Sequence, residues 1–467
     1  MSSAIMASGE RFNLNKDWPM RRSFVRRSLF AASALAAAPG GALASGFAVE
    51  HQNAAAQGAA YAGAQAKGAD AGFAAFNPAA LAGLDRAEFS ANATVLFGKT
   101  GYENASATLL GAFPASGLSA DDGVLPVAFV PASAIAFPVS DRLTLGLTIT
   151  SPFGLRSEYD VASAARYYAQ DADLLTIAVA PTAAYEVTDR IAIGASLRIQ
   201  YADLTVSQVV DAGGVAFLNT IPGFAPGSSD LFAEFKADDV AIGFLAGAQV
   251  EPVDGFRLGF SYASKIEHDF NGEATFDIAG SPAAAVLNGA VGLFADTDFT
   301  STLRLPASYS LGASADVSER VTLLASVALT KWSVFDQFVL DFANPAQPPE
   351  IITANWDDSW SFGIGAEYQA SDSTALRAGF AYDETPVTDQ FAGPRIPDTD
   401  RRWLNAGVSH AFSDRLTVDL AAGLNVAPKT REIRLDGTAP GDFLRGALTA
   451  DVNVDTYTVS LRSRFKF

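Results

Sequence analysis

The chain has no cysteine and only three histidines among its 467 residues. Disulfide bonds are therefore excluded, and the thiolate and imidazole ligands of most zinc sites are absent or scarce. After the N-terminal region there is no apolar run of about 18 residues, so the sequence does not indicate a helical membrane protein. The absence of such a run does not exclude membrane-spanning β-strands, because each needs only about ten alternating residues.

Basic residues are also few. The chain has 32 Lys and Arg against 51 Asp and Glu, and without residues 1–44 the balance is 26 against 49. Such an acidic protein repels the phosphate backbone, so we predict no nucleic-acid partner.

Motifs for catalysis are missing too. There is no Gly-x-Ser-x-Gly motif, and His51, His268 and His410 lie far apart in the sequence without the spacing of metal ligands. We therefore predict that the protein is not an enzyme and has no metal and no cofactor.

The N-terminus has the pattern of an export signal. Four arginines between positions 21 and 27 precede an Ala- and Leu-rich run over 28–38, and Ala42-Leu43-Ala44 supplies small residues for cleavage. We predict a signal peptide over residues 1–44, with Met20 as an alternative start. Arg21-Arg22 also fits a twin-arginine signal, but a barrel must cross the inner membrane unfolded, which favours the general secretory route.

A short sequence motif recurs along the chain: a polar turn followed by alternating apolar residues. Ser, Thr and Asp in these turns bond their own backbone, which is typical of hairpins. One apolar and one small or polar face alternate with a period of two after each turn, as in a strand between two different environments. The four copies span residues 140–145, 188–193, 318–323 and 413–418.

Alternation and turn signals together predict fourteen strands. Six connections between them are tight and seven are long, an arrangement typical of an outer-membrane barrel of a Gram-negative bacterium. We therefore predict an all-β fold, a 14-stranded antiparallel transmembrane β-barrel spanning 87–467. The predicted strands are 87–97, 126–138, 142–153, 172–187, 190–206, 238–251, 255–276, 300–316, 320–340, 356–370, 374–386, 400–412, 415–433 and 447–467.

The last predicted strand alternates cleanly and ends on Phe467. This resembles the signal by which outer-membrane barrels are inserted, so we predict that the strand engages the barrel assembly machinery. An edge strand of a soluble sheet is the alternative, but an edge this apolar invites aggregation. Trp332, Trp356, Trp360 and Trp403 lie near predicted strand ends, where we expect aromatic anchors in the headgroup region.

Residues 45–86 have no period of two and are rich in Ala, Gly and Gln. A fourteen-stranded barrel is wide enough to leave a bore, and we predict that this segment forms a small N-terminal plug inside the lumen.

Short sequence motifs occur in a fixed order along almost the whole chain. Together they resemble FadL-type outer-membrane transporters of long-chain fatty acids and aromatic hydrocarbons (FadL/TodX-like). They begin with Ser45-Gly46-Phe47 at the predicted mature start and include Asn77-Pro78-Ala79 and the Pro152-Phe153-Gly154 region. The other pieces span residues 58–63, 158–159, 166–168, 305–312, 332–335, 356–360, 376–380, 383–387 and 397–403.

The resemblance implies passive uptake of hydrophobic compounds, captured at outer loops, moved to a lumenal pocket and released sideways through a gap in the wall. It implies that Phe47 lies at the pocket, that Asn77, Pro78 and Ala79 line the plug beside the gap, and that Gly154 marks the kink that opens it. Hydrophobic small molecules are the expected partners, together with outer-membrane lipid and detergent-like molecules.

The backbone chemistry of the Pro152–Gly154 and Asn77-Pro78 segments is compatible with these implied roles. Pro152 cannot donate to a ladder and Gly154 weakens one, so strand pairing is expected to fail near Phe153, although the strand could also simply end at Ser151. Asn77-Pro78 is typical of a helix start, with Asn as the cap and Pro in the first turn.

A fatty acid also needs a cation for its carboxylate. We name Arg156, Arg166 and Arg401 as contacts, with Arg395 and Arg402 as further loop candidates. No Lys or Arg occurs at 201–208 or 349–356, where the family resemblance leads us to look for basic ligands, and this leaves uncharged aromatic or aliphatic hydrocarbons as an alternative cargo. A barrel of this kind is also compatible with a general porin, an adhesin that binds through loop 207–237, or an outer-membrane phospholipase.

Overall fold

The computed structural model describes residues 46–426 and 430–467. The predicted signal peptide, residues 1–44, lies outside the described residues. Within the described ranges, no helix is both long and apolar enough to cross a bilayer.

Fourteen strands, each antiparallel to its neighbours, close into a barrel when β1 pairs with β22 from Glu88–Lys466 to Thr108–Ala447. This confirms the predicted fold class. The wall consists of β1 (Glu88–Leu109), β4 (Ala128–Pro138), β5 (Leu143–Thr150) continued by β6 (Gly154–Glu158), β7 (Asp171–Thr188), β8 (Ile191–Asp211), β9 (Asp230–Val253), β10 (Phe256–Ala263) continued by β11 (Ile266–Asp277), β12 (Thr297–Leu305) continued by β13 (Ser308–Ser318), β14 (Val321–Thr330), β17 (Ser359–Ser371), β18 (Thr374–Asp383), β19 (Arg401–Ala411), β20 (Leu416–Asn425) continued by β21 (Arg431–Leu435), and β22 (Ala447–Lys466).

Several predicted strands are interrupted. The predicted strand 300–316 divides into β12 and β13 around Pro306, which has no amide hydrogen to give to a neighbouring strand. The strand 255–276 divides at Ser264, whose backbone and side chain bond Phe244. The strand 320–340 ends at Thr330, where the 3₁₀ turn η4 (Trp332–Val334) leads into the outer loops.

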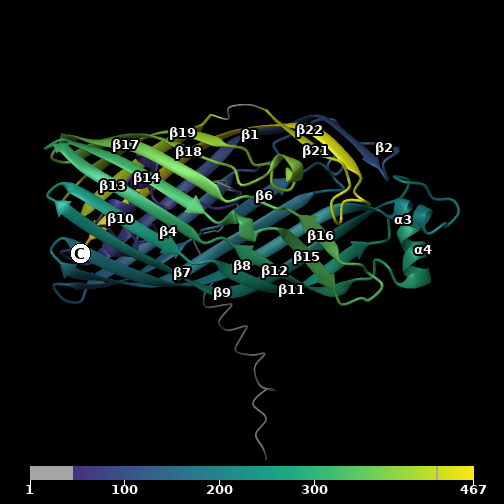
Figure 1. Cartoon of the computed structure of the whole chain (residues 1–467), viewed down its shortest axis with the longest axis horizontal. Helices are drawn as coiled ribbons and strands as arrows, with labels where there is room; N and C mark the ends of the chain where they lie inside the picture. The colour runs from purple at the N-terminus through teal and green to yellow at the C-terminus, as the bar shows by residue number, and fades with distance from the viewer. Residues whose placement is uncertain (1–45, 427–429) are drawn as a thin grey trace, which may run out of the picture. The chain divides into compact units, whose positions relative to one another are not determined.

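The two ends of the barrel differ. Tight turns and the C-terminus lie at one end, and α3 (Ala212–Leu218) and α4 (Pro282–Val291) lie side by side at the other (Figure 1). The long outer loops also carry β2 (Phe113–Ala115), β3 (Asp121–Asp122), β15 (Gln337–Phe342), β16 (Glu350–Thr353) and the 3₁₀ turn η5 (Asp389–Phe391). The period of two predicted for the wall is present in β8, where Ile193 and Leu197 are exposed while Ser196 and Gln200 are buried.

Residues 46–86 occupy the barrel interior. Four short elements of this segment contact strands on every side of the ring, from β1, β4 and β5 through β10 and β13 to β18 and β22, which only an enclosed segment can do. They are α2 (Ala54–Gly58), η1 (Ala64–Ala66), η2 (Ala71–Phe73) and η3 (Pro78–Leu81). We refer to residues 46–86 as the plug.

Wall glycines let the plug approach closely. A Cβ on Gly259 would lie 1.9 Å from the carbonyl oxygen of Gln65, and one on Gly379 would lie 2.3 Å from the backbone of Ala59. Side chains larger than hydrogen at these places would push the plug away from the wall.

The expectation of interfacial tryptophans is wrong for three of the four. Trp332, Trp356 and Trp403 are at most 5% exposed and pack inside the barrel, whereas Trp360 is 44% exposed. An indole has an apolar body and one N–H, so it suits a lumenal pocket as well as the headgroup region, and the sequence does not distinguish the two.

Candidate functional site

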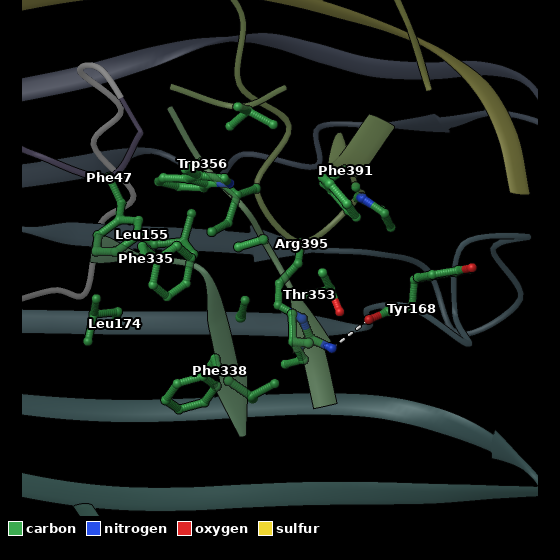
Figure 2. A pocket seen from close by; sticks show the side chains of 18 of the residues that line it. Phe47, Leu155, Tyr168, Leu174, Phe335, Phe338, Thr353, Trp356, Phe391 and Arg395 are labelled. Atoms are coloured by element: carbon green, nitrogen blue, oxygen red, sulfur yellow. Dashed lines mark hydrogen bonds between the residues drawn. The ribbon is translucent and has the colours of Figure 1, made fainter. Parts of the chain in front are cut away.

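An apolar pocket of about 970 Å³ lies between the plug, the inner wall and the outer loops, and we refer to it as the outer pocket. Figure 2 shows an aromatic end, where Phe47, Phe335 and Trp356 lie together, and a more polar end around Arg395. Such a division suits a ligand with an apolar body and a polar head.

Phe47 closes the aromatic end. It is 2% exposed, and its ring centroid lies 4.7 Å from that of Trp332 and 5.6 Å from those of Phe335 and Trp356. The preceding Gly46 has a φ of 68°, and a Cβ there would lie 2.7 Å from Trp356, so only glycine fits. The N-terminal aromatic side chain is thus itself held as an apolar ligand of the pocket.

The wall is broken next to this residue. The ladder between β4 and β5 runs from Pro138–Thr144 to Ser133–Ile149 and stops there, while β6 pairs with β7 alone. Residues Ala128–Ala132 of β4 therefore have their wall partner only on the β1 side. The break coincides with the Pro152-Phe153-Gly154 segment singled out in the sequence.

The plug and β7 take over the hydrogen bonds at this kink. The amide of Val49 donates to the carbonyl of Pro152, and the amide of Gly154 donates to the carbonyl of Phe47, both over 2.9 Å. The Phe153 amide donates to Thr176 Oγ1 (2.9 Å) on β7. Buried backbone groups are thereby satisfied without β4.

Val49 also covers the open edge of β4. It packs against Leu96, Ala128 and Val130, which belong to β1 and the part of β4 without a β5 partner. The same three residues, 47–49, thus occupy the outer pocket, bond the kink and cover the break in the wall.

Asn77, Pro78 and Ala79 lie at the start of η3, which contacts β5 and β7 as well as β8 and β9, so their predicted role beside the gap stays a prediction. Asn77 Oδ1 accepts from the Ala79 amide (3.0 Å) and caps η3, as its sequence predicts, while its Nδ2 donates to the carbonyls of Gln65 (2.7 Å) and Ala248 (3.1 Å). All three residues are buried against wall glycines of β8 and β9, and none lines either cavity described here. Their contacts fix the plug to the wall.

None of the three arginines named first lines the outer pocket. Arg156 lies 3.8 Å from Glu158 and 3.9 Å from Asp173, Arg166 binds Asp230, and Arg401 forms an ion pair with Asp398. These guanidinium groups are neutralised by side chains of the chain itself, and sequence alone does not show such pairing.

Arg395 is one of two arginines that line the outer pocket. Its Nη2 donates to the Tyr168 carbonyl (2.5 Å) and to Gln208 Oε1 (3.0 Å), while its buried Nη1 has no hydrogen-bond partner among the described residues. Burial and the nearby Arg445 lower the pKa of Arg395 to about 9, so it is charged at neutral pH in surroundings that penalise the charge.

Arg445 also lines the outer pocket, but its charge is matched. It bonds Glu350 and Asp442, and these carboxylates raise its pKa. Gln208 and Glu350 belong to the segments in which the sequence offered no basic residue, and Arg395 and Arg445, from other loops, bring positive charge to them. Arg445 was missed because it is distant from those segments in sequence.

A second space, the inner cavity, lies between the plug and the middle of the barrel and has a volume of about 1350 Å³. Val49, Pro152 and Phe153 line it on the side of the kink. Phe47 and Phe153, with ring centroids 6.2 Å apart, lie between the inner cavity and the outer pocket.

A family model described as outer membrane protein transport protein (OMPP1/FadL/TodX) matches residues 35–467. The chain belongs to this family. Membership confirms the predicted resemblance and the location in the outer membrane of a Gram-negative bacterium.

Family members include a protein from Escherichia coli O6:H1 (strain CFT073) named long-chain fatty acid transport protein, 28% identical over 90% of this chain and 96% of its own length. The crystal structure of a Pseudomonas aeruginosa FadL homologue is 26% identical, has a TM-score of 0.82, and is matched over 90% of this chain and all of that one. The Ralstonia pickettii toluene transporter TbuX shares the fold, with 21% identity, a TM-score of 0.62 and coverage of 88% and 98%.

Proposed function

We propose that this member of the FadL/TodX family is a passive outer-membrane channel for long-chain fatty acids. Cargo enters the outer pocket, displaces Phe47 and leaves sideways through the break in the wall beside Phe153. The protein performs no reaction and needs no cofactor. The main support for this proposal is that one short segment, residues 47–49, both fills an apolar pocket and closes the adjacent gap between β4 and the kink.

Burial of the acyl chain drives capture. Each methylene gains about 0.8 kcal/mol on leaving water, so an apolar pocket attracts the chain and the bilayer accepts it afterwards without an energy source. A ligand at the aromatic end competes with the Phe47 ring for the same surface. Displacing that ring pulls on the bonds from Phe47 and Val49 to the kink, which links occupancy of the pocket to opening of the wall.

Arg395 favours a carboxylate over an uncharged cargo. An Nη1 that lacks a partner in a buried site gains a charge-assisted hydrogen bond from an anion, and such bonds are among the strong ones. Uncharged hydrocarbons remain the second candidate, because the rest of the pocket lining is mainly apolar.

Binding measurements on Arg395→Gln test the cargo. We expect the affinity for palmitic acid to fall about tenfold or more, since a hydrogen bond to a charged group contributes about 1.5–3 kcal/mol, while the affinity for methyl palmitate stays within about twofold. Arg156→Gln is the matched control, because Arg156 is also an arginine near the pocket but faces carboxylates of the chain. Equal loss for acid and ester would favour the hydrocarbon cargo.

A cysteine at Val49 tests the sideways route, because the chain contains no other thiol. We expect a lipid-soluble maleimide to react with Val49→Cys from the bilayer and to abolish uptake into proteoliposomes. Asp141→Cys, in a tight turn, is the control whose labelling leaves uptake unchanged. Full uptake after complete labelling at position 49 would contradict exit through the wall.

Single-channel conductance separates this proposal from a general porin. We expect almost no ion current through the wild-type protein, because the plug fills the bore. A large steady current would support the porin instead.

The predicted engagement of the β22 strand and Phe467 by the assembly machinery stays a prediction.

A further inference from the structure

Arg198 is a positively charged residue in the barrel wall that no residue in the described part of the chain neutralises. It lies on β8, lines the inner cavity, and forms no ion pair or hydrogen bond with any residue in 46–426 or 430–467. The other arginines of the barrel interior behave differently. Arg377 bonds Glu367 (2.7 Å), and Arg462 bonds Asp419 (2.6 Å) and Asp70.

The immediate neighbours of Arg198 already have partners or are apolar. Along β8, Ser196 Oγ bonds Thr182 Oγ1 (2.7 Å) and Gln200 Nε2 lies 3.1 Å from His268 Nε2. Across β9, Arg198 pairs with Gly243, which has no side chain to offer. The strand pairing therefore leaves the guanidinium with small neighbours and with Gln200, whose Oε1 has no hydrogen-bond partner among the described residues and so does not bond Arg198.

Acidic side chains of the inner cavity do not supply the missing partner. Glu50 and Asp383 line the same space, but neither forms an ion pair with Arg198. A charged group kept away from bulk water without a counter-charge is costly, and ionisable groups facing the lumen of membrane proteins commonly mark the path of a substrate.

The position of Arg198 relative to the kink suggests what it binds. Pairs Val179–Ile199 and Thr182–Ser196 place Ala180 opposite Arg198, and Ala180 pairs in turn with Thr148 of β5. The kink begins three residues after Thr148, at Ser151. Arg198 and the kink residues Pro152 and Phe153 line one cavity, so a molecule there can meet the cation and the break in the wall together.

We propose that Arg198 forms a second carboxylate-binding site, in the inner cavity, that holds the head of an ionised fatty acid while its acyl chain enters the break beside the kink. This inference rests on the proposed function for its cargo. The acid thus passes from Arg395 in the outer pocket to Arg198 in the inner cavity, and the acyl chain leaves before the head.

Carboxyl NMR of the full-length mature protein tests the site directly. With ¹³C-carboxyl palmitic acid and the protein in lipid nanodiscs, we expect two bound carboxyl signals. Arg198→Gln removes one signal and weakens binding at that site about tenfold or more, and Arg395→Gln removes the other. Arg198→Lys retains both signals, because a cation remains.

The signal that depends on Arg395 also reports folding, since it persists in Arg198→Gln only if the barrel and its outer pocket are intact. Two bound signals in Arg198→Gln, or only one in the wild type, would overturn the second site. Uptake of palmitic acid into proteoliposomes is measured separately. A protein that shows both signals but no uptake contradicts the proposed channel and leaves the binding site standing.

Discussion

The plug is attached to the wall in two different ways. Its first residues, 46–53, reach the kink mainly through single neutral hydrogen bonds, such as those from Val49 to Pro152 and from Gln52 Nε2 to the Ser151 carbonyl (2.7 Å). Its middle residues are held by ion pairs to β17 and β22 of the wall, and Asp70 and Arg462 in this network are buried. These pairs link Lys67 to Glu367, Asp70 to Arg462 and Arg464, and Asp419 to Arg462 and Arg377.

The difference indicates which part can yield to a ligand. A neutral hydrogen bond contributes about 0.5–1.5 kcal/mol to stability. Removing one partner of a buried ion pair costs about 3–5 kcal/mol. The beginning of the plug can therefore leave the kink while the middle stays fixed. Under the proposed function, cargo is steered to the wall because the bore stays closed.

Arg462→Met should have the largest effect on stability. The change leaves Asp70 and Asp419 buried without their main cation, and we expect the free energy of unfolding in urea to fall by about 3–5 kcal/mol. Arg464→Met is the control, since Arg464 is more exposed and Asp70 keeps Arg462, so that about 1 kcal/mol or less should be lost. Equal losses in the two variants would mean that the network does not hold the plug.

Asn77→Ala should have an intermediate effect. It removes the cap of η3 and the donors to Gln65 and Ala248, which we expect to cost about 1–2 kcal/mol in the same unfolding measurement. Asn77→Asp separates the two roles, because it retains the capping oxygen and loses the donors. A fully stable Asn77→Ala would contradict a structural role for this residue.

Gln52→Ala should have the smallest global effect and a clear local one. It removes one strong and one long hydrogen bond between Gln52 and Ser151, and we expect this loss to cost about 0.5–1.5 kcal/mol of stability. The bonds belong to residues 46–53, a segment that we expect to open while the rest of the barrel stays folded. Hydrogen exchange of the Val49 and Gly154 amides should accelerate, while exchange in the wall strands is unchanged. Uniform acceleration throughout the barrel would contradict independent opening of residues 46–53.

Alternation and turn chemistry were sufficient to predict the wall. Every predicted strand overlaps an observed one, because membrane strands show a period of two and their tight turns carry recognisable polar residues. The local interruptions of the strands were harder to predict. Pro152 and Pro306 both break strands, but only the pairing pattern shows that the first break leaves β4 without its neighbour.

The site was only partly predictable. The placement of Phe47 at the pocket followed from the family resemblance, whereas the positions of Trp332 and Trp356 predicted a membrane belt in place of the aromatic cage that they form. Choosing among the arginines required knowing their partners. Arg166 and Arg401 each form an ion pair with an aspartate near them in space, while Arg395 forms none with any residue that the structure describes, and no local sequence signal records that difference.

The close fit between wall glycines and plug has a practical consequence. At the inward wall glycines Gly194, Gly259 and Gly379, plug backbone lies within van der Waals reach. Inward glycines in the strands of a distant relative can accordingly serve as markers of where its own stopper rests. Conversely, a plug taken from one such protein would collide with the interior of another whose glycines fall at different heights.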